Sequence, residues 1–410
     1  MKKKLLSLAL CTVMSASLIA GCGSSGSDSS GGGSSDQTSE EGSGAAGNSE
    51  SGSSEAADLS SFPADTIKIG VESFDTTDEQ FMALQEYLDY LADNLNLEMM
   101  YSESIDSAEA EMDFIDSCAS AGCDAIFAYY NVSPEAIQEA IDKGMYYWGT
   151  EQYAPDYEDN EYYVGCYTFT EGDSDENGDY LGGYQLGYSL GEQGVKHVFY
   201  CNGGASFGVQ MFIDRQSGFE AGIAAAQADG YEIEYDSSAD VIEGWPGTDD
   251  FTAAVSSKLS GDYDGAAVSF NAATLFQPIN DAGKADSIKI AAIGGVNDTY
   301  YDAFNSGLVS TIVYDCEEVV FGNGIVSIIN AVTGHGDVTR DGDVAGRVLT
   351  YRWTLQDADQ FNAIYDLHDN GEYYITAQDV ANLCAEYNSS VTFDEINSYY
   401  QSFTLENTVK

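Results

Sequence analysis

The feature that most restricts the fold of this chain is a regular alternation of short apolar segments with longer amphipathic ones. Residues 66–71, 97–101 and 124–129 are compact apolar runs of strand length. Between them, residues 78–94 and 107–121 repeat apolar side chains at helical spacing. Strands that are apolar along their whole length are typical of a parallel sheet with helices on both faces. The sequence therefore predicts an α/β fold.

The same alternation starts again after an acidic, glycine-rich stretch at residues 171–183. The second series of predicted strands comprises residues 196–201, 231–235, 265–270, 288–293 and 308–313. Two consecutive series predict two doubly wound, Rossmann-like lobes with a ligand cleft between them. In such sheets, ligands bind at the carboxyl ends of the strands. Residues 347–353 are expected to be the third strand that crosses between the lobes.

A C-terminal extension, residues 357–410, exceeds what the two lobes need. It contains three helix-like stretches, and two of them begin with the spacing of a capping box, at Thr376 with Asp379 and at Thr392 with Glu395. We expect this helical extension to pack on the second lobe.

Three local motifs add a family resemblance to this pattern. Arg215 begins an Arg-x-x-Gly-Phe segment, Asn271 ends an apolar strand, and residues 303–312 read AFNSGLVSTI. In order and spacing, residues 66–334 resemble the type I periplasmic-binding-protein family, specifically the ribose/galactose-binding group of sugar receptors of ABC transporters. The resemblance implies a binding protein, not an enzyme, that takes a small ligand and delivers it to permease subunits.

The resemblance also implies the domain boundaries. The first lobe is expected to comprise residues 62–172 and 315–346, and the second lobe residues 173–314 and 347–356. Residues 357–410 then follow as the extension.

The N-terminal segment predicts export and attachment to a membrane by lipid. Residues 1–21 combine three lysines with an apolar run that is too short to span a bilayer stably, as in a signal peptide. Residues 18–22 resemble a bacterial lipobox, which implies cleavage before Cys22 and a diacylglycerol on its thiol; an ordinary signal peptide is the alternative. Residues 22–61, rich in Ser, Gly and acidic side chains, are expected to be a disordered tether. The predicted location is the extracytoplasmic face of the cell membrane.

The acidic composition restricts the partners further. The chain has 69 Asp and Glu against 14 Lys and Arg, a formal net charge of -55. Such a surface repels phosphate backbones and anionic lipids, so we expect no nucleic-acid partner and contact with the membrane through the lipid anchor alone. We expect a monomer. Because the chain has only four arginines, an arginine inside the fold is a candidate for a specific role.

Arg215 is the first candidate for a ligand contact. Its guanidinium offers a fork of donors that suits paired hydroxyls or a carboxylate, and the resemblance implies a ligand-contacting arginine at this position. An ion pair at a helix end is the alternative. Asn271 can both donate and accept, as a pair of hydroxyls requires, or it can cap the helix that follows.

Aromatic side chains in the loops that follow strands are further candidates, because an aromatic ring can stack on the apolar face of a sugar. Trp245, Phe74, Tyr130 and Phe207 occupy such loops, although each could instead hold its loop against the sheet. The polar groups expected near the cleft or the crossings are Asp75, Glu151, Gln152, Asn297, Asp298, Tyr314 and Asp315.

Neither the cysteines nor the acidic loops predict a metal site. Six cysteines follow Cys22, several of them in or beside apolar strands, which favours buried free thiols over disulfides and zinc. Residues 173–178 and 337–343 resemble incomplete calcium loops, but the first lacks the required glutamate and the second contains Arg340. We expect no metal and no cofactor.

The sequence thus predicts an extracytoplasmic solute-binding lipoprotein of an ABC importer, which captures a small polar ligand, with a sugar as the first choice, between two closing lobes. A nucleoside or signal-molecule receptor of the same fold is the first alternative. A surface glycoside hydrolase is the second, but the chain has no G-x-S-x-G or H-E-x-x-H motif and its three histidines lie far apart in the sequence.

Overall fold

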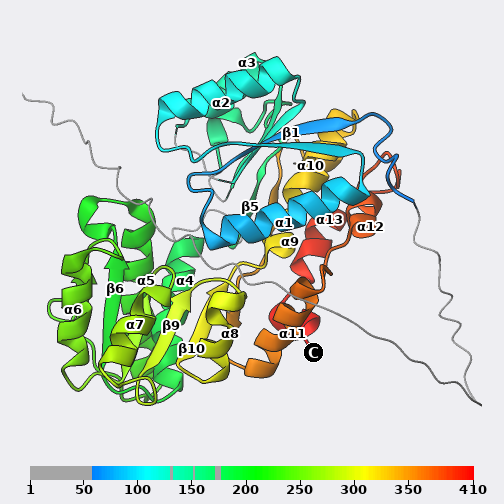
Figure 1. The fold of residues 1–410 in the computed structure, drawn as a ribbon. Helices are drawn as coiled ribbons and strands as arrows, with labels where there is room; N and C mark the ends of the chain where they lie inside the picture. The colour runs from blue at the N-terminus through cyan, green and yellow to red at the C-terminus, as the bar shows by residue number, and fades with distance from the viewer. Residues whose placement is uncertain (1–57, 130–132, 151–152, 171–176) are drawn as a thin grey trace, which may run out of the picture. The chain divides into compact units, whose positions relative to one another are not determined.

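The computed structural model describes residues 58–129, 133–150, 153–170 and 177–410, all of which belong to the unit Glu55–Lys410 (Figure 1). None of the described helices is long and apolar enough to cross a membrane. Several predicted features lie outside the described residues: the signal peptide, the lipidation site Cys22, the tether up to residue 57, the ligand candidates Tyr130, Glu151 and Gln152, and residues 173–176 of the first calcium-like loop.

The first lobe contains a four-stranded parallel sheet in the order β2-β1-β3-β4. Its strands are β1 (Ile67–Glu72), β2 (Leu97–Tyr101), β3 (Ala125–Ala128) and β4 (Tyr146–Trp148), and its helices are α1 (Glu79–Asn94), α2 (Ala108–Ala121) and α3 (Glu135–Asp142). Asp78 caps α1 by accepting a hydrogen bond from the backbone N–H of Phe81, and Ser107 caps α2 in the same way. The predicted parallel sheet is confirmed here.

The second lobe contains a six-stranded sheet in the order β14-β10-β9-β8-β6-β7, in which only β14 is antiparallel to its neighbour. The strands are β6 (Val198–Gly203), β7 (Val241–Glu243), β8 (Gly265–Val268), β9 (Lys289–Ile293), β10 (Val309–Tyr314) and β14 (Trp353–Leu355). The helices are α4 (Gly178–Glu192), α5 (Gln210–Ala228), α6 (Asp249–Leu259), α7 (Ala273–Asp281) and α8 (Asp298–Asn305).

The prediction of one strand in this lobe is wrong. Residues 231–235 make only an isolated bridge, between Glu234 and His197, and the edge strand is β7 instead. The backbone N–H of Asp236 donates to the Asp240 carboxylate at 2.9 Å, which holds a turn at this point. The turn delays regular pairing with β6 until Val241.

Glycines allow α4 and α5 to pack with their backbones in close approach. A Cβ atom at Gly183 would overlap the carbonyl oxygen of Arg215, and one at Gly218 would overlap that of Tyr180. Because of this close packing, the first turn of α4 lies beside the middle of α5. Asp179 and Arg215 are thereby brought within hydrogen-bonding distance.

The chain passes between the lobes three times. The first crossing follows β5 (Cys166–Thr168), the second follows β10 and leads into α9 (Glu317–Val320) and α10 (Gly322–Val332), and the third joins β13 (Arg347–Leu349) to β14. Since β13 pairs in parallel with β5, the third crossing begins after Leu349, slightly later than the expected boundary at residue 346. The helical segment after the second crossing is divided at Phe321 into α9 and α10.

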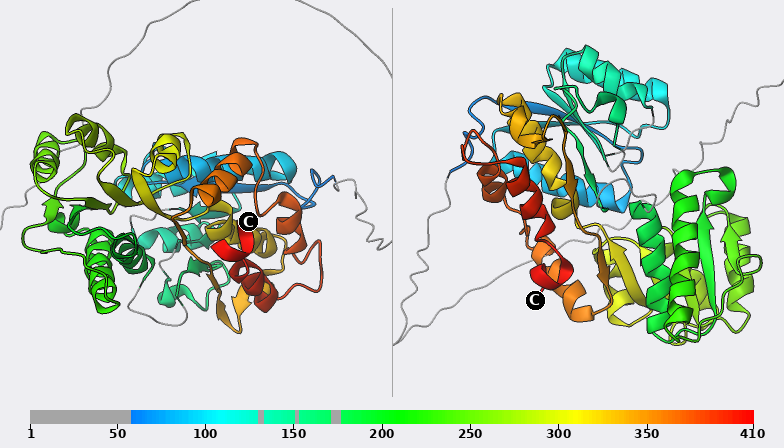
Figure 2. Two further views of the ribbon diagram at one scale, coloured as in Figure 1. Left: turned by 90° about the horizontal axis from the view of Figure 1, so that it is seen from below. Right: turned by 180° about the vertical axis from the view of Figure 1, so that it is seen from behind.

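The C-terminal extension packs on both lobes and not on the second lobe alone (Figures 1 and 2). Helix α11 (Ala358–Asp369) contacts α8 and β14 of the second lobe, as expected. Helix α12 (Ala377–Asn382) contacts α1 and α10, and α13 (Phe393–Gln401) contacts β13. The apolar faces of α12 and α13 are buried there, and both predicted capping boxes are present. A short α14 (Leu405–Thr408) follows.

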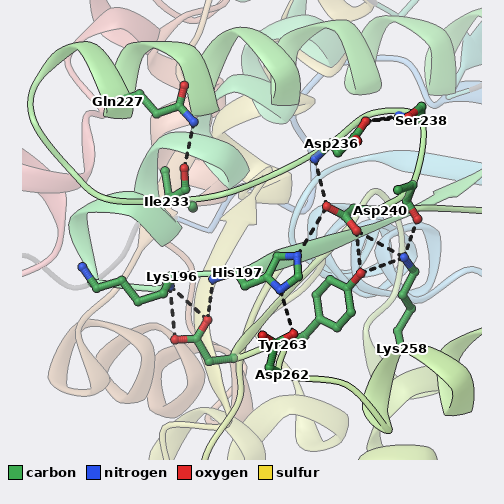
Figure 3. A network of polar contacts seen from close by, with 12 residues as sticks. Lys196, His197, Gln227, Ile233, Asp236, Ser238, Asp240, Lys258, Asp262 and Tyr263 are labelled. Carbon is green, nitrogen blue, oxygen red and sulfur yellow. Dashed lines mark hydrogen bonds and ion pairs between the residues drawn. The ribbon is translucent and has the colours of Figure 1, made fainter.

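A network of polar contacts lies at the amino ends of the second lobe's strands (Figure 3). Asp240, only 4% exposed, accepts hydrogen bonds from Tyr263 at 2.5 Å and from Lys258 at 3.3 Å. The imidazole of His197 stacks on the Tyr263 ring with a centroid separation of 3.9 Å. A second cavity, of about 620 Å³, borders this network at His197 and Asp262. Because ligands of such folds bind at the opposite end of the strands, we assign this network to stability.

Candidate functional site

A cavity of about 1260 Å³ is lined by residues of both lobes and of the crossings between them. Its walls come from the segments that follow strands, such as Tyr129 after β3 and Asp315 after β10, and from the first turns of α4 and α5. The cavity therefore lies at the carboxyl ends of the strands, where doubly wound folds bind their ligands. Three of the chain's four arginines, Arg215, Arg347 and Arg352, line it.

Arg215 reaches the cavity from the second turn of α5. Its Nε donates to the Asp179 carboxylate at 2.8 Å and its Nη1 donates to the Ser269 carbonyl at 2.7 Å. The guanidinium is held in place by these two bonds and its side chain is 13% exposed. Arg215 therefore lines the cavity and also forms the ion pair of the alternative, while its contact with a ligand stays a prediction.

Arg352 joins the three crossings. Its Nη2 donates to the Asp315 carboxylate at 2.7 Å and its Nε to the other carboxylate oxygen, while Nη1 donates to the Gly178 carbonyl. Asp315 lies on the second crossing, Gly178 follows the first crossing, and Arg352 itself lies on the third. The guanidinium also lies over the ring of Phe169, 4.6 Å from its centroid. This arrangement places a charged clamp where the lobes are joined.

Aromatic rings form another part of the wall. Phe321 lies between Tyr129 and Tyr167, with ring centroids 5.4 Å from each. The Tyr129 hydroxyl donates to the Gln80 side chain at 3.0 Å, and Gln80 in turn donates to the Asp315 carbonyl at 3.4 Å. Burial raises the pKa of Tyr129 well above its ordinary value, so this hydroxyl stays protonated at neutral pH. The cavity combines aromatic faces with oriented hydrogen-bonding groups.

Asn271 and Tyr314 lie outside the lining of this cavity. The Asn271 carboxamide oxygen accepts from the backbone N–H of Ala273 at 2.8 Å and from the Tyr300 hydroxyl at 3.1 Å. Asn271 therefore lies just before α7, but the cap position is Ala272 and α7 has no side-chain cap hydrogen bond, so the alternative role of a helix cap is not confirmed. Tyr314 is 1% exposed, and its hydroxyl donates to Glu317 at 2.6 Å.

The described aromatic candidates are exposed side chains of loops outside the cavity lining. Phe207 and Trp245 stack on one another, with ring centroids 5.9 Å apart and planes inclined by 3°. They are 64% and 45% exposed, and Phe74 is 50% exposed. The structure therefore brings Phe207 and Trp245 together, and their contact with a ligand stays a prediction.

The remaining described polar candidates bind other parts of the protein. Asn297 caps α8, and its Nδ2 donates at 3.2 Å to Glu79 of the first lobe. Asp298 accepts a hydrogen bond from Tyr365 of the extension. Asp75 accepts from the backbone N–H of Thr77 at 2.9 Å within its own loop.

Several residues of the cavity were not predicted. Arg347 and Arg352 carried the same signal as Arg215, since both are rare cations inside the fold. Asp179 and Gln80 are ordinary helix residues in the sequence, and only the packing of α4, α5 and the crossings brings them to the cavity. Asp315, expected near a crossing, does line it.

The described part of the chain contains one group of side chains with the composition and spacing of a metal site: Cys316, Glu318 and His368. The carboxylates of the second calcium-like loop form no such group. The six cysteines from Cys118 to Cys384 are buried, and none forms a disulfide among the described residues.

No protein-family model matches the chain, and no curated protein matches it. Solved structures do. A galactofuranose-binding protein matches with a TM-score of 0.57 and 16% identity over 75% of this chain and 100% of its own. An ABC transporter solute-binding protein from Bacillus halodurans with bound myo-inositol matches with a TM-score of 0.55 and 11% identity, over 74% and 98%.

This chain has the type I periplasmic-binding-protein fold. The expectation drawn from the sequence motifs is thereby confirmed for the fold. Within this fold, the transcription regulator CcpA of Lactococcus lactis also matches, with a TM-score of 0.52 and 17% identity over 71% of this chain and 97% of its own. The type I periplasmic-binding-protein fold alone therefore does not assign a function, and the function has to be inferred from the residues that line the cavity.

Proposed function

We propose that this protein is the extracytoplasmic solute-binding protein of an ABC importer and that it captures a sugar or a related polyol in the cavity between its lobes. The observation that carries the proposal is the lining of that cavity, where the forked donors of Arg215 lie in a wall that also has the faces of Tyr129, Tyr167 and Phe321. Hydroxyl groups need oriented donors and acceptors, while the carbon face of a sugar ring packs well on aromatic rings.

The charges of the cavity favour a neutral ligand over an anion. Three arginines line it, but five carboxylates do so as well. Asp179 and Asp315 already pair with Arg215 and Arg352. An anionic ligand would have to displace these carboxylates, whereas a polyol can donate its hydroxyl protons to them.

The location is part of the same proposal. A signal peptide at residues 1–21, a lipid on Cys22 and a tether to residue 61 would hold the monomeric binding body outside the membrane, next to its permease. Closure of the two lobes on the sugar would create the state that the permease recognises, since contacts from both lobes stabilise the closed form. No catalytic step is needed.

Titration calorimetry of the full chain against hexoses, pentoses, furanose sugars, inositols and nucleosides tests the proposal. We expect one sugar or inositol to bind with a Kd on the order of 1 μM or tighter, which is about −8 kcal/mol. Binding of nucleosides alone would replace the sugar with the alternative ligand class. A folded protein without a response to any member of the panel would contradict the proposal, and hydrolysis of a glycoside would assign an enzyme instead.

A further inference from the structure

Three side chains with metal-binding groups meet where the second crossing contacts the C-terminal extension. Cys316 is the residue directly before α9, Glu318 lies in the first turn of α9, and His368 lies near the end of α11. One ligand atom from each, the thiol sulfur, a carboxylate oxygen and an imidazole nitrogen, lies within 4.8 Å of the other two. Cys316 and Glu318 are neighbours at the start of α9, but His368 lies 50 residues after Glu318 in the sequence, so no local motif predicts the group.

The Glu318 carboxylate is buried with one oxygen unsatisfied. Its Oε1 accepts a hydrogen bond from the backbone N–H of Tyr374 at 3.1 Å and lies 3.1 Å from Nε2 of His368. Its Oε2 has no hydrogen-bond partner among the described residues, although Glu318 is 0% exposed. Leaving a buried carboxylate oxygen without a partner is costly, and such groups are rare in native proteins. A ligand for this oxygen would remove that cost.

The composition of the group selects the ligand. We infer that Cys316, Glu318 and His368 bind a zinc ion. Thiolate, carboxylate and imidazole are the three protein ligand types of zinc, and one of each gives a site that sodium or calcium, which prefer oxygen, would not choose. The 3.1 Å between the His368 nitrogen and the Glu318 oxygen is near the separation of about 3.3 Å between two ligands of a tetrahedral zinc ion.

Charge and solvent access are also consistent with zinc. A thiolate and a carboxylate together carry two negative charges, which Zn²⁺ neutralises in a place where Cys316 and Glu318 are both 0% exposed. The His368 side chain is 19% exposed, so its side of the group leaves a route for the ion and for a water as fourth ligand. Glu317 is occupied separately, because it accepts the Tyr314 hydroxyl.

Zinc at this position would connect α9 to α11 directly. Helix α9 begins at the second crossing, and α11 packs on α8 of the second lobe. The ion would therefore fasten the extension to the place where the lobes are joined, and it would stabilise the folded chain according to its concentration.

Binding of zinc and of cobalt to the reduced, tag-free full chain tests the inference. We expect the chain to retain one zinc per molecule through gel filtration, and zinc to raise Tm by about 2–5 °C. Co²⁺ in place of zinc should give the near-ultraviolet thiolate-to-cobalt charge-transfer band and the visible bands of a four-coordinate ion. Cys316→Ser should lose both the retained zinc and the charge-transfer band.

The control is Cys384→Ser, which removes an equally buried free thiol of the extension and should leave both signals intact. His368→Asn should weaken zinc binding more than 10-fold, whereas His335→Asn should not change it. A cobalt band that persists in Cys316→Ser would overturn the inference, as would wild-type protein that retains no zinc. If Cys316→Ser does not fold, the cobalt spectrum of the wild-type protein alone tests whether Cys316 is a ligand. Absence of the thiolate-to-cobalt band from that spectrum would exclude Cys316.

Discussion

The guanidinium of Arg352 makes two hydrogen bonds to the carboxylate of Asp315, one from Nε and one from Nη2. Asp315 is the first residue after β10 and Arg352 is the last before β14, so the pair joins the second and third crossings between the lobes. A further hydrogen bond from Arg352 to the Gly178 carbonyl adds the segment that follows the first crossing. The ion pair and the hydrogen bond thus hold the three crossings together at the edge of the second lobe.

Removal of Arg352 should destabilise the protein strongly. The Arg352 and Asp315 side chains are only 12% and 8% exposed, so Arg352→Ala leaves a largely buried carboxylate without its cation. We expect a loss of about 3 kcal/mol in the free energy of unfolding, measured by urea denaturation. The double variant Arg352→Ala with Asp315→Ala should recover part of this loss, and a double variant no more stable than Arg352→Ala would contradict the coupling.

Substitution of Arg215 should affect the ligand more than the fold. Arg215→Lys keeps the charge near Asp179 but loses the fork of donors. Once a ligand is identified, we expect its affinity to fall about 10-fold or more in calorimetry, while Tm changes little. Arg340→Lys is the matched control, since Arg340 binds the backbone carbonyls of Glu158 and Asp343 and lies outside the cavity lining. Equal effects of the two substitutions on ligand affinity would contradict a ligand contact by Arg215.

The sequence predicts the sheets better than the site. The apolar run at residues 66–71 corresponds to β1 because a parallel strand buried on both faces has no other pattern. The prediction of a strand over residues 231–235 is wrong, because nothing in their composition reveals the turn that Asp236 and Asp240 make. The sequence does not predict Arg352 as a residue of the site, since its role depends on contacts with Asp315 and Gly178 that form only in the folded chain.

A buried acid should make the protein less stable at alkaline pH. Glu72 is 0% exposed, and neither carboxylate oxygen has a hydrogen-bond partner among the described residues. Burial first, and then the nearby Glu111, raise the pKa of Glu72 well above its ordinary value of about 4.3. The folded chain therefore holds this proton more tightly than the unfolded chain, and stability falls as the pH rises from about 4.3 through the raised pKa.

Glu72→Gln should remove this dependence. We expect the variant to have a Tm a few degrees above wild type at pH 8 and a difference that shrinks toward pH 4, as measured by calorimetric melts across that range. Glu98→Gln, at a side chain that is 58% exposed, is the control and should follow wild type. A Glu72→Gln curve parallel to that of wild type would contradict the account.

The polar network of Figure 3 should make stability depend on pH in the opposite sense to Glu72. Burial alone would raise the pKa of Asp240, but hydrogen bonds from Tyr263, the Asp236 backbone and Lys258 bring it below its ordinary value. The stabilisation is therefore present above about pH 3.9 and is lost as the pH falls through the lowered pKa. Asp240→Asn should cost about 2 kcal/mol in urea denaturation at pH 7.

The difference between Asp240→Asn and wild type should shrink as the pH falls below about 3.9, because the unfolded chain then takes up a proton that the folded chain resists until the lowered pKa is passed. Asp262→Asn tests the specificity of this effect, because Asp262 contacts the same His197 but its side chain is 92% exposed. We expect its stability to match wild type at all pH values. A loss for Asp240→Asn that stays constant down to pH 3 would exclude the charge as its cause.

A crystal structure of the full chain with the tightest-binding member of the sugar and inositol panel tests the central claim most directly. The account predicts the ligand in the cavity between the lobes, with a hydroxyl within hydrogen-bonding distance of Arg215 and a carbon face against the wall formed by Tyr129, Tyr167 and Phe321. A ligand seated outside this cavity, for example on the exposed pair Phe207 and Trp245, would contradict it.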